Sequence, residues 1–328
     1  MIAITGASGL LGTFIVSYFI SEGEDVVALK RKESDTTSLE QLHNKFLWRE
    51  ADVLDPISLS ESFKGVDTVI HSAALVSFNA RKVREIFEVN VMGTKNVVDT
   101  CLTIGVKKLI YISSVAALGR QKGINQITEE SHWIDSRLES DYARSKYQAE
   151  LEVFRGYEEG LHISIVNPSV ILAPADWNKS SSRIFKYIWD ERPFYTNGIL
   201  NYVDVRDVAK MVYLLHTANF NGERFIASAD HVSYKEIFDK IAKRFNKKKP
   251  SIKVNPSFTR LVASIEGLRC LLTKQEPIIT MQLARMACDP FHYDNTKAVE
   301  KLKINFKTLD ETLDFCCKYH GQKITINK

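Results

Sequence analysis

A tyrosine and a lysine, Tyr142 and Lys146, stand four residues apart in a segment, residues 141–157, that we predict to be helical. Residues with this spacing lie on one face of a helix, about 6 Å apart. Free tyrosine has a pKa of about 10 and exchanges its proton poorly at neutral pH, but a nearby cation favours the phenolate. We therefore expect Tyr142 to move protons and Lys146 to lower its pKa. A lone Tyr-x-x-x-Lys spacing is common on solvated helix faces, so the interpretation depends on other segments.

A glycine-rich segment near the N-terminus supplies the second chemical signal. Residues 1–5 form an apolar run typical of a buried strand, and residues 10–22 have the apolar spacing of a helix. At the turn between them, Gly6 can make the tight bend, Gly9 can let the backbone approach a pyrophosphate, and Gly12 can let the helix pack closely. Unpaired amides at the helix start would face the phosphates. The flanking strand and helix disfavour an incidental glycine-rich turn.

The elements that must position these groups alternate along the chain. We predict strands near residues 1–5, 25–30, 46–51, 66–71, 108–114 and 162–167, with helices near 10–22, 79–104 and 141–157. This alternation predicts an α/β fold with a parallel, doubly wound sheet. Beyond residue 168 we predict a helix near 181–191, a strand near 199–203, a helix over 204–218 and a strand over 224–227. Capping boxes at Ser233 with Glu236 and Thr308 with Glu311 predict two further helix starts.

Composition narrows the class of protein. The 328 residues are 45% hydrophobic and 26% charged, which is typical of a globular protein with a large core. A net charge of +4 is too small for a nucleic-acid surface without a concentrated patch, and we expect none. Five cysteines without a C-x-x-C pair favour a reducing cytoplasm. We expect no membrane span, because no apolar run reaches roughly 18 to 20 residues, and no metal site, because no metal-ligand spacing occurs.

Three further segments complete a family resemblance. They are His71-Ser72-Ala73-Ala74 after a predicted strand, Asn90-Val91-Met92-Gly93-Thr94 within a predicted helix, and Tyr111-Ile112-Ser113-Ser114 at a strand end. With the two motifs above, the chain resembles the extended short-chain dehydrogenases/reductases of the NAD(P)-dependent epimerase/dehydratase superfamily, from Met1 to the region of residues 294–298. The resemblance implies a Rossmann domain of residues 1–167 plus about 200–228. A smaller interleaved C-terminal substrate lobe would hold about 168–199 plus 229–328.

The resemblance also assigns roles to individual residues. Ser114 would bind the substrate carbonyl, Tyr142 would protonate the developing alkoxide, and Lys146 would hold the nicotinamide ribose. Adjacent strand residues point to opposite faces, so only one of Ser113 and Ser114 can serve, and the place of Ser114 in the segment 113–119 resembles that of the family's catalytic Ser or Thr. Expected cofactor contacts are Gly6, Ser8, Gly9, Leu10, Leu11, Gly12, Lys30, Arg31, Asp52, Val53, Ala73, Ala74, Asn90, Tyr142, Lys146, Pro168 and Val170, and expected substrate contacts are Val76, Ser114, Tyr142 and Asn167. For Asn90, a role in tying the helix to a strand is an equal alternative.

The end of the second predicted strand bears on the choice of cofactor. An NAD enzyme usually presents an acidic residue there to the ribose 2′-hydroxyl, but this chain has Lys30 and Arg31. Arg31 could form a bidentate pair with a 2′-phosphate, so NADP(H) is favoured over NAD(H). The alternative is that both residues are solvated loop charges.

The reaction implied by the resemblance is hydride transfer between a nicotinamide cofactor and a ketone or aldehyde. Sugar-nucleotide dehydratases carry an Asp-Glu pair after the catalytic Thr, whereas this chain has Val115-Ala116. The Lys30-Arg31 strand end and the segment 167–174 look more like dihydroflavonol-4-reductase and related carbonyl reductases, although Ala173 departs from the usual glycine. The alternatives are a nucleotide-sugar epimerase with tightly bound NAD and a non-catalytic NADP-binding regulatory protein.

Substrate identity is not encoded in any single motif. Besides Val76, the positions that could line a pocket are Ser77, Phe78, residues 183–187 and Tyr202. Arg183 or Arg206 could bind an anionic group, but salt bridges are the more ordinary role. The resemblance also implies a homodimer formed through the helices that carry Asn90 and Tyr142.

Overall fold

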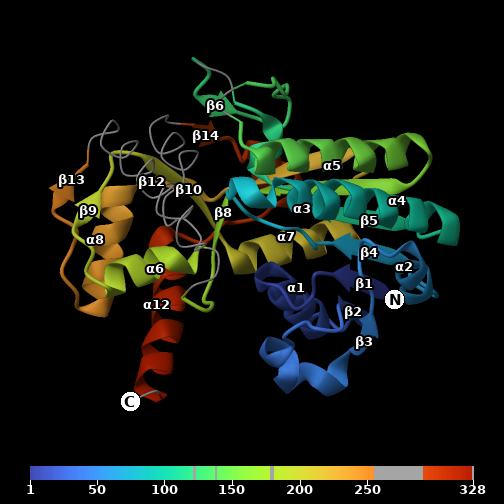
Figure 1. The fold of residues 1–328 in the computed structure, drawn as a ribbon, viewed down its shortest axis with the longest axis horizontal. Helices are drawn as coiled ribbons and strands as arrows, with labels where there is room; N and C mark the ends of the chain where they lie inside the picture. Colours follow the sequence, from blue (N-terminus) through green and yellow to red (C-terminus); the bar gives the residue numbers. More distant parts are fainter. Residues whose placement is uncertain (121–122, 137–138, 178–180, 255–290, 327–328) are drawn as a thin grey trace.

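A seven-stranded parallel sheet forms the centre of the protein (Figure 1). The computed structural model describes residues 1–120, 123–136, 139–177, 181–254 and 291–326. The strands of this sheet are β1 (Ile2–Thr5), β2 (Val26–Lys30), β3 (Leu47–Glu50), β4 (Thr68–His71), β5 (Lys108–Ile112), β7 (His162–Pro168) and β11 (Glu223–Ala227), in the spatial order β11-β7-β5-β4-β1-β2-β3. The order reverses between β1 and β4, and ligands of doubly wound sheets bind at such a switch point.

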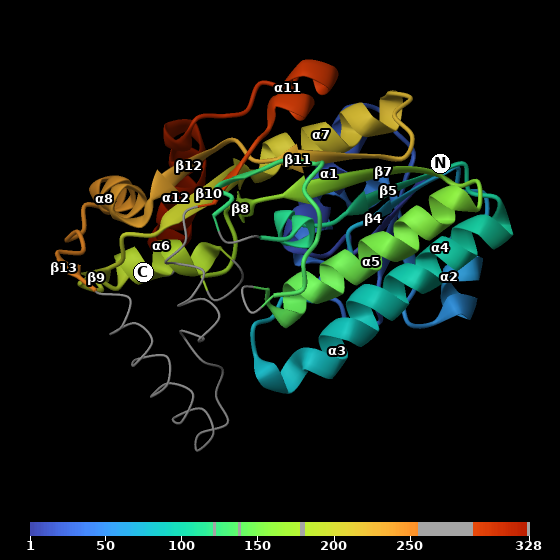
Figure 2. The ribbon, with the colours of Figure 1, turned by 90° about the horizontal axis from the view of Figure 1, so that it is seen from above.

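Helices cover both faces of this sheet, as the predicted alternation requires (Figure 2). On one face, α1 (Leu10–Ser21) and α7 (Val205–Thr217) pack on side chains such as Ile4 and Ile110. On the other, α2 (Pro56–Ser62), α4 (Gly93–Ile104) and α5 (Asp141–Glu158) pack on side chains such as Ala3 and Leu109. Strands buried on both faces read as continuous apolar runs. This explains why the central strands could be predicted.

The long helix predicted near 79–104 is interrupted. It comprises a 3₁₀ turn (Ala80–Lys82), α3 (Val83–Phe87), a π-helical turn (Glu88–Met92) and α4. The π turn accommodates an extra backbone residue per turn, and such turns often occur at functional sites. Helix α2 was not predicted, because its seven residues are too few to show a periodic pattern. Its start is nevertheless marked by Asp55, whose side chain accepts a hydrogen bond from the Ile57 amide.

A smaller lobe packs beside the large sheet. Its own sheet has the order β12-β10-β8, built from β8 (Val170–Leu172), β10 (Ile199–Asp204) and β12 (Asp230–Ser233). Three helices complete it: α6 (Ser182–Trp189), α8 (Tyr234–Phe245) and α12 (Leu309–Ile326). The remaining elements are β6 (Gln126–Ile127), paired with β14 (His292–Tyr293), β9 (Phe194–Tyr195), paired with β13 (Ile252–Lys253), and α11 (Thr296–Leu302).

Both predicted helix starts are confirmed, with one capping bond at Ser233 and a reciprocal pair at Thr308. The Ser233 hydroxyl accepts from the Glu236 amide at 3.1 Å, and Thr308 and Glu311 bond reciprocally, at 2.8 Å from the Thr308 amide and 3.3 Å from the Glu311 amide. These bonds satisfy amides that a helix start leaves unpaired. They therefore position α8 and α12 in the small lobe.

The two lobes are interleaved in sequence. Strand β10 pairs with β8 and β12 in the three-stranded sheet, and α7 follows directly from Val205. From there α7 packs on α1, and β11 adds to the edge of β7. Neither lobe is formed by one continuous segment.

Within the residues that the structure describes, no helix is long and apolar enough to cross a membrane. The same residues contain no cluster of three or more side chains that could bind a metal ion. Cys101, Cys316 and Cys317 are buried free thiols, whereas Cys270 and Cys288 lie outside the described residues.

Candidate active site

The glycine turn lies at the carboxyl end of β1, beside the end of β4. Gly6 has a φ of +67°, and a Cβ on it would lie 2.8 Å from the Ala73 backbone. A Cβ on Gly12 would lie 2.1 Å from the Gly6 carbonyl oxygen. Gly9 is exposed, and its amide donates to the Gly6 carbonyl at 2.9 Å. The turn is therefore a tight backbone cradle that leads into the N-terminus of α1, where unpaired amides suit a diphosphate.

The ends of β2 and β3 lie next to this turn. Lys30, the last residue of β2, has its ammonium 5.7 Å from the centroid of the Trp48 ring, and the Arg31 side chain is exposed. Asp52, beyond β3, accepts a hydrogen bond from the Leu54 amide at 2.9 Å. Val53 packs against Gly93 at the start of α4, where a Cβ would lie 2.8 Å from its side chain. The residues expected at the adenosine end thus lie on neighbouring strand ends, with basic side chains after β2.

Ser114 and Tyr142 come together from different elements. Ser114 follows β5 and begins the 3₁₀ turn Val115–Leu118, where its hydroxyl accepts from the Ala116 amide at 3.2 Å. Ser140 caps α5 by accepting from the Ala143 amide at 3.0 Å, which places Tyr142 in the first turn. The Ser114 side chain lies near enough to the Tyr142 hydroxyl to favour its phenolate form and so lower its pKa. The Phe78 ring lies edge-on to the Tyr142 ring, with centroids 5.9 Å apart.

The environment of Tyr142 differs from the expectation. Burial raises the pKa of Tyr142 to about 12, and the nearby Ser114 side chain opposes this rise. The expected lowering of the tyrosine pKa by Lys146 is therefore not observed in this arrangement, because desolvation of the phenolate outweighs the favourable contacts. Tyr142 is protonated at neutral pH, which is the form that donates a proton.

Lys146 lies one turn further along α5 and is 1% exposed. Its ammonium donates to the Tyr111 hydroxyl and to the Ile112 carbonyl, both at 2.8 Å. Burial lowers the pKa of Lys146 to about 7, and Glu150 acts in the opposite direction. The lysine can therefore change its charge close to neutral pH.

A buried polar network behind Lys146 was not predicted. The Thr5 hydroxyl oxygen accepts from the Ser72 and Ala73 amides, both at 3.1 Å, and lies 2.8 Å from His71 Nδ1. His71 Nε2 lies 3.0 Å from the Thr94 hydroxyl. Because Thr5 already accepts twice, its proton points to Nδ1, so Nε2 carries the ring proton. Burial lowers the pKa of His71 to about 3, and the ring is neutral.

Asn90 lies in the π turn, and its side-chain amide forms hydrogen bonds with other residues of the protein. Its Oδ1 accepts from the Leu75 amide at 2.7 Å, and its Nδ2 donates to the Leu75 carbonyl at 3.0 Å and to the Ser145 hydroxyl at 2.9 Å. The residue ties the loop after β4 to α5, in line with the structural alternative. Its contact with a cofactor stays a prediction.

The positions expected to contact substrate differ in their exposure to solvent. Val76 is 62% exposed in the loop after β4, close in sequence to Phe78. Asn167 is fully buried and donates to the Ser114 carbonyl at 3.0 Å, so it supports the site from behind. Tyr202 packs in the core of the small lobe, and Arg206 pairs with Asp204 at 2.6 Å, which corresponds to the ordinary structural roles.

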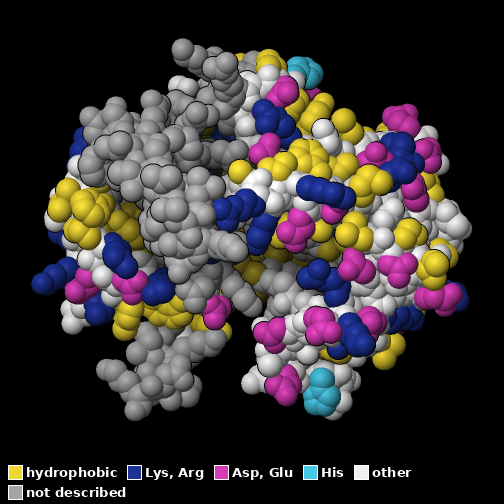
Figure 3. All heavy atoms as spheres, in the orientation of Figure 1, with side chains coloured by type: hydrophobic (Ala, Val, Ile, Leu, Met, Phe, Trp, Pro, Cys, Tyr) yellow, Lys and Arg dark blue, Asp and Glu magenta, His cyan; other side chains and the backbone are white. Residues whose placement is uncertain are grey.

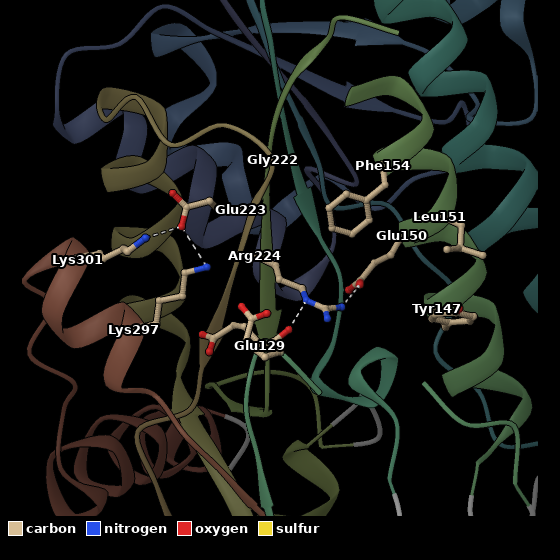
Figure 4. A pocket seen from close by; sticks show the side chains of 11 residues that line it. Glu129, Tyr147, Glu150, Leu151, Phe154, Gly222, Glu223, Arg224, Lys297 and Lys301 are labelled. Atoms are coloured by element: carbon tan, nitrogen blue, oxygen red, sulfur yellow. Dashed lines mark hydrogen bonds and ion pairs between the residues drawn. The ribbon is translucent and has the colours of Figure 1, made fainter. Parts of the chain in front are cut away.

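A cavity of about 660 Å³ lies away from these catalytic positions (Figure 4). It runs along the β11 edge of the large sheet, between α5 and α11. Its lining includes Glu150, Glu223, Arg224, Lys297 and Lys301. Its charged side chains pair with one another: Glu223 with both lysines, and Arg224 with Glu150. The cavity is thus distinct from the candidate active site, although Glu150 connects the two.

Comparisons with known proteins agree with this geometry. A sequence model of the NAD dependent epimerase/dehydratase family matches residues 2–227. A Synechocystis sp. protein provisionally named dihydroflavonol 4-reductase is 29% identical over 317 residues, covering 94% of this chain and 91% of its own. Cinnamoyl-CoA reductase 1 of Oryza sativa is 28% identical, covering 66% and 67%.

Solved structures extend the likeness to the whole fold. The protein gox2253 has a TM-score of 0.84 at 27% identity, with 98% of both chains covered. A UDP-glucose 4-epimerase from Thermotoga maritima has a TM-score of 0.79 at 19% identity, covering 98% of this chain and 99% of its own, which shows the shared fold. With a family match across more than half of its length, this chain belongs to the NAD dependent epimerase/dehydratase family.

Proposed function

We propose that this protein is an NADP(H)-dependent oxidoreductase that interconverts a ketone or aldehyde and the corresponding alcohol. The observation that carries the proposal is the position of Lys146, which is buried one turn after Tyr142 on α5 and donates to the Ile112 carbonyl at the carboxyl end of β5, two residues before Ser114. The relatives named as reductases support this reaction over others on the same fold.

The residues present fit a nicotinamide dinucleotide, because Gly6 and Gly12 allow a turn too tight for any added Cβ, and this turn leads into the N-terminus of α1, where a diphosphate can bind. When bound, this cofactor would supply or accept the hydride. Ser114 Oγ and Tyr142 Oη would both donate hydrogen bonds to the substrate carbonyl oxygen, and Tyr142 would then transfer its proton to that oxygen. Lys146 would hold the ribose and stabilise the phenolate that remains.

The proposed preference for NADP(H) depends on Lys30 and Arg31. Lys30 is the last residue of β2 and Arg31 follows it, and a guanidinium matches a phosphate dianion that an aspartate would repel. Calorimetric titration of NADPH and NADH would test the preference, after the denatured supernatant has been checked for carried-over cofactor. We expect little retained cofactor and at least about tenfold tighter NADPH binding, equivalent to about 1.4 kcal/mol.

A nucleotide-sugar epimerase is the second candidate, favoured by the fold shared with the UDP-glucose 4-epimerase. Retained NAD without a phosphate preference would support it and refute the reductase proposal. A non-catalytic NADP-binding protein would bind NADPH but consume none with any aldehyde or ketone.

Substitution Tyr142→Phe tests the mechanism directly. Loss of the proton donor should reduce turnover about 100- to 10,000-fold while sparing cofactor affinity. The matched control is Tyr147→Phe on the same helix, where the tyrosine ring stacks on Trp133 at 4.5 Å. A loss below about tenfold at Tyr142, or an equal loss at Tyr147, would contradict the assignment.

We further propose a cytoplasmic protein that forms a homodimer through α4 and α5. Figure 3 shows hydrophobic side chains in yellow on the surface over α5. Two exposed apolar side chains support the dimer: Leu151 of α5, which is 50% exposed, and Met92 just before α4, which is 47% exposed. Buried thiols fit a reducing compartment. Light scattering at micromolar concentration should give a dimer mass that Leu151→Glu lowers, and cell fractionation should place the protein in the cytosol.

A further inference from the structure

Glu150 is a buried carboxylate that lies on the same helix face as Tyr142 and Lys146. The three residues are spaced by four along α5, which places them one above another. Glu150 is 1% exposed, and a carboxylate at such a depth is costly unless it is paired. Its Oε1 accepts from Asn167 Nδ2 at 2.6 Å, and its Oε2 accepts from the Arg224 guanidinium at 3.3 Å.

The contact with Asn167 leads directly to Ser114. An amide nitrogen has two protons, and Asn167 Nδ2 uses one on Glu150 and the other on the Ser114 carbonyl, at 3.0 Å. The carboxylate, which only accepts, therefore fixes which way the amide of Asn167 faces. The amide in turn holds the backbone of Ser114, whose side chain lies near enough to Tyr142 to affect its pKa.

Arg224 holds the carboxylate from the far side. From β11 its guanidinium also donates to the Glu129 carbonyl at 2.8 Å and to the Ser131 carbonyl at 3.3 Å. Figure 4 shows Arg224 extended between Glu150 and Glu129, while Glu223 next to it pairs with lysines of α11. A guanidinium bonded on three sides has little freedom, so Glu150 has a fixed partner.

Glu150 also supplies charge to the catalytic helix. It favours the protonated form of Lys146 and so opposes the effect of burial on the lysine pKa. The other titratable groups near Lys146 are Tyr111 of β5, whose pKa burial raises, and His71 of β4, whose pKa burial lowers to about 3. Both are neutral at physiological pH. Tyr142, one turn earlier on α5, is neutral as well.

We propose that Glu150, clamped by Arg224, is a positioning residue of the active site that orients Ser114 through Asn167 and places a negative charge one helical turn beyond Lys146. The inference rests on the proposed function, because Ser114 and Lys146 act on substrate and cofactor there. It adds a third member to the Tyr142 and Lys146 face of α5.

The test compares Glu150→Gln with Glu150→Asp. Glutamine keeps the shape but removes the charge, so we expect kcat to fall at least about tenfold with KM changed less than about threefold. The basic limb of the kcat pH profile should move to lower pH, because Lys146 loses its proton sooner. Aspartate keeps the charge and should return this limb towards its original position. Glu152→Gln on the same helix, where the carboxylate pairs with Arg155, should leave both quantities unchanged.

A second readout is independent of turnover. The Lys146 side chain, labelled with ¹³C at Cε and assigned with Lys146→Arg, can be titrated by NMR in the folded full-length protein. Its midpoint should lie lower in Glu150→Gln than in the wild type and Glu152→Gln. An unchanged midpoint together with an unshifted pH profile would reduce Glu150 to a structural ion pair and overturn the inference. A wild type that consumes no NAD(P)H would instead refute the proposed function, and the NMR titration would still decide the charge effect.

Discussion

Substitution of Gly12 by alanine should weaken cofactor binding more than it weakens the fold. A Cβ on Gly12 would lie 2.1 Å from the Gly6 carbonyl oxygen, whereas ordinary contacts begin at 3.4 Å. The two groups must therefore separate by roughly 1 Å. Gly6 lies so close to the end of β4 that a Cβ on it would meet the Ala73 backbone at 2.8 Å, so we expect α1 to shift outward with its N-terminal amides.

The expected magnitudes separate two effects of the same substitution. Alanine favours a helix by about 1 kcal/mol over glycine, which offsets part of the roughly 1 to 3 kcal/mol that overpacking costs. The net loss of unfolding free energy should thus be at most about 2 kcal/mol. The displaced amides should raise the Kd for NADPH at least about tenfold, which corresponds to about 1.4 kcal/mol.

The assay is calorimetric titration of NADPH together with urea unfolding, with Gly23→Ala as the control. Gly23 has a φ of +85° and nothing within 4 Å of its Cβ position, so alanine there should cost about 1 to 2 kcal/mol of stability. It should leave the NADPH Kd unchanged. A Gly12→Ala protein that binds NADPH within about twofold of wild type would refute the role of the glycine turn as the phosphate cradle.

Three further predictions follow from the site. Asn90→Ala should lower the unfolding free energy by about 2 to 3 kcal/mol in urea titrations, because it removes three buried hydrogen bonds; a change below about 0.5 kcal/mol would contradict this. Because the pKa of Lys146 is lowered from 10.5 to about 7, the unfolded chain binds more protons between these values, and stability should rise with pH. Lys146→Met should reduce the gain in unfolding free energy between pH 7.5 and 9.5 by about 2 kcal/mol, and an equal gain in both proteins would oppose the low pKa. Replacing Lys30 and Arg31 together by Asp and Ser should lower the NADPH-over-NADH preference in Kd at least about tenfold, and an unaltered ratio would make them ordinary surface charges.

Much of the nucleotide-binding half could be predicted because its signals are local. Strands buried on both faces are continuous apolar runs, and the turn after β1 needs glycine where φ is positive or where backbones nearly touch, as at Gly6 and Gly12. The roles of Ser114 and Tyr142 were predicted from the family resemblance and stay predictions, although the structure places the Ser114 side chain near enough to affect the pKa of Tyr142. Helix α2 and the π turn were not predicted, because each has fewer residues than the window of about 11 to 18 over which helical periodicity can be recognised.

The support for the site could not be predicted in the same way. Three different elements supply this support: β7 carries Asn167, α5 carries Glu150 and β11 carries Arg224. The residue pattern of a single element cannot predict contacts between elements that are far apart in the sequence. One signal was available, since a glutamate four residues after Lys146 must share its helix face. The pKa of Tyr142 depends mainly on its desolvation by the surrounding fold, and the spacing of residues along the sequence does not predict how deeply a side chain is buried.

Strand β11 lies far after β7 in the sequence, which has a consequence for the synthesis of the chain. Strand β7 is complete at Pro168, but its outer edge is paired only by Glu223–Ala227, after the chain has passed through part of the small lobe. During synthesis β7 therefore has an unpaired edge until β11 has been made, and an unpaired strand edge can pair with strands of other chains. The nucleotide-binding half cannot fold first and independently as an N-terminal unit usually does. Shortened versions ending near residue 167 should aggregate on expression, and ribosome-bound chains of that length should depend on chaperones.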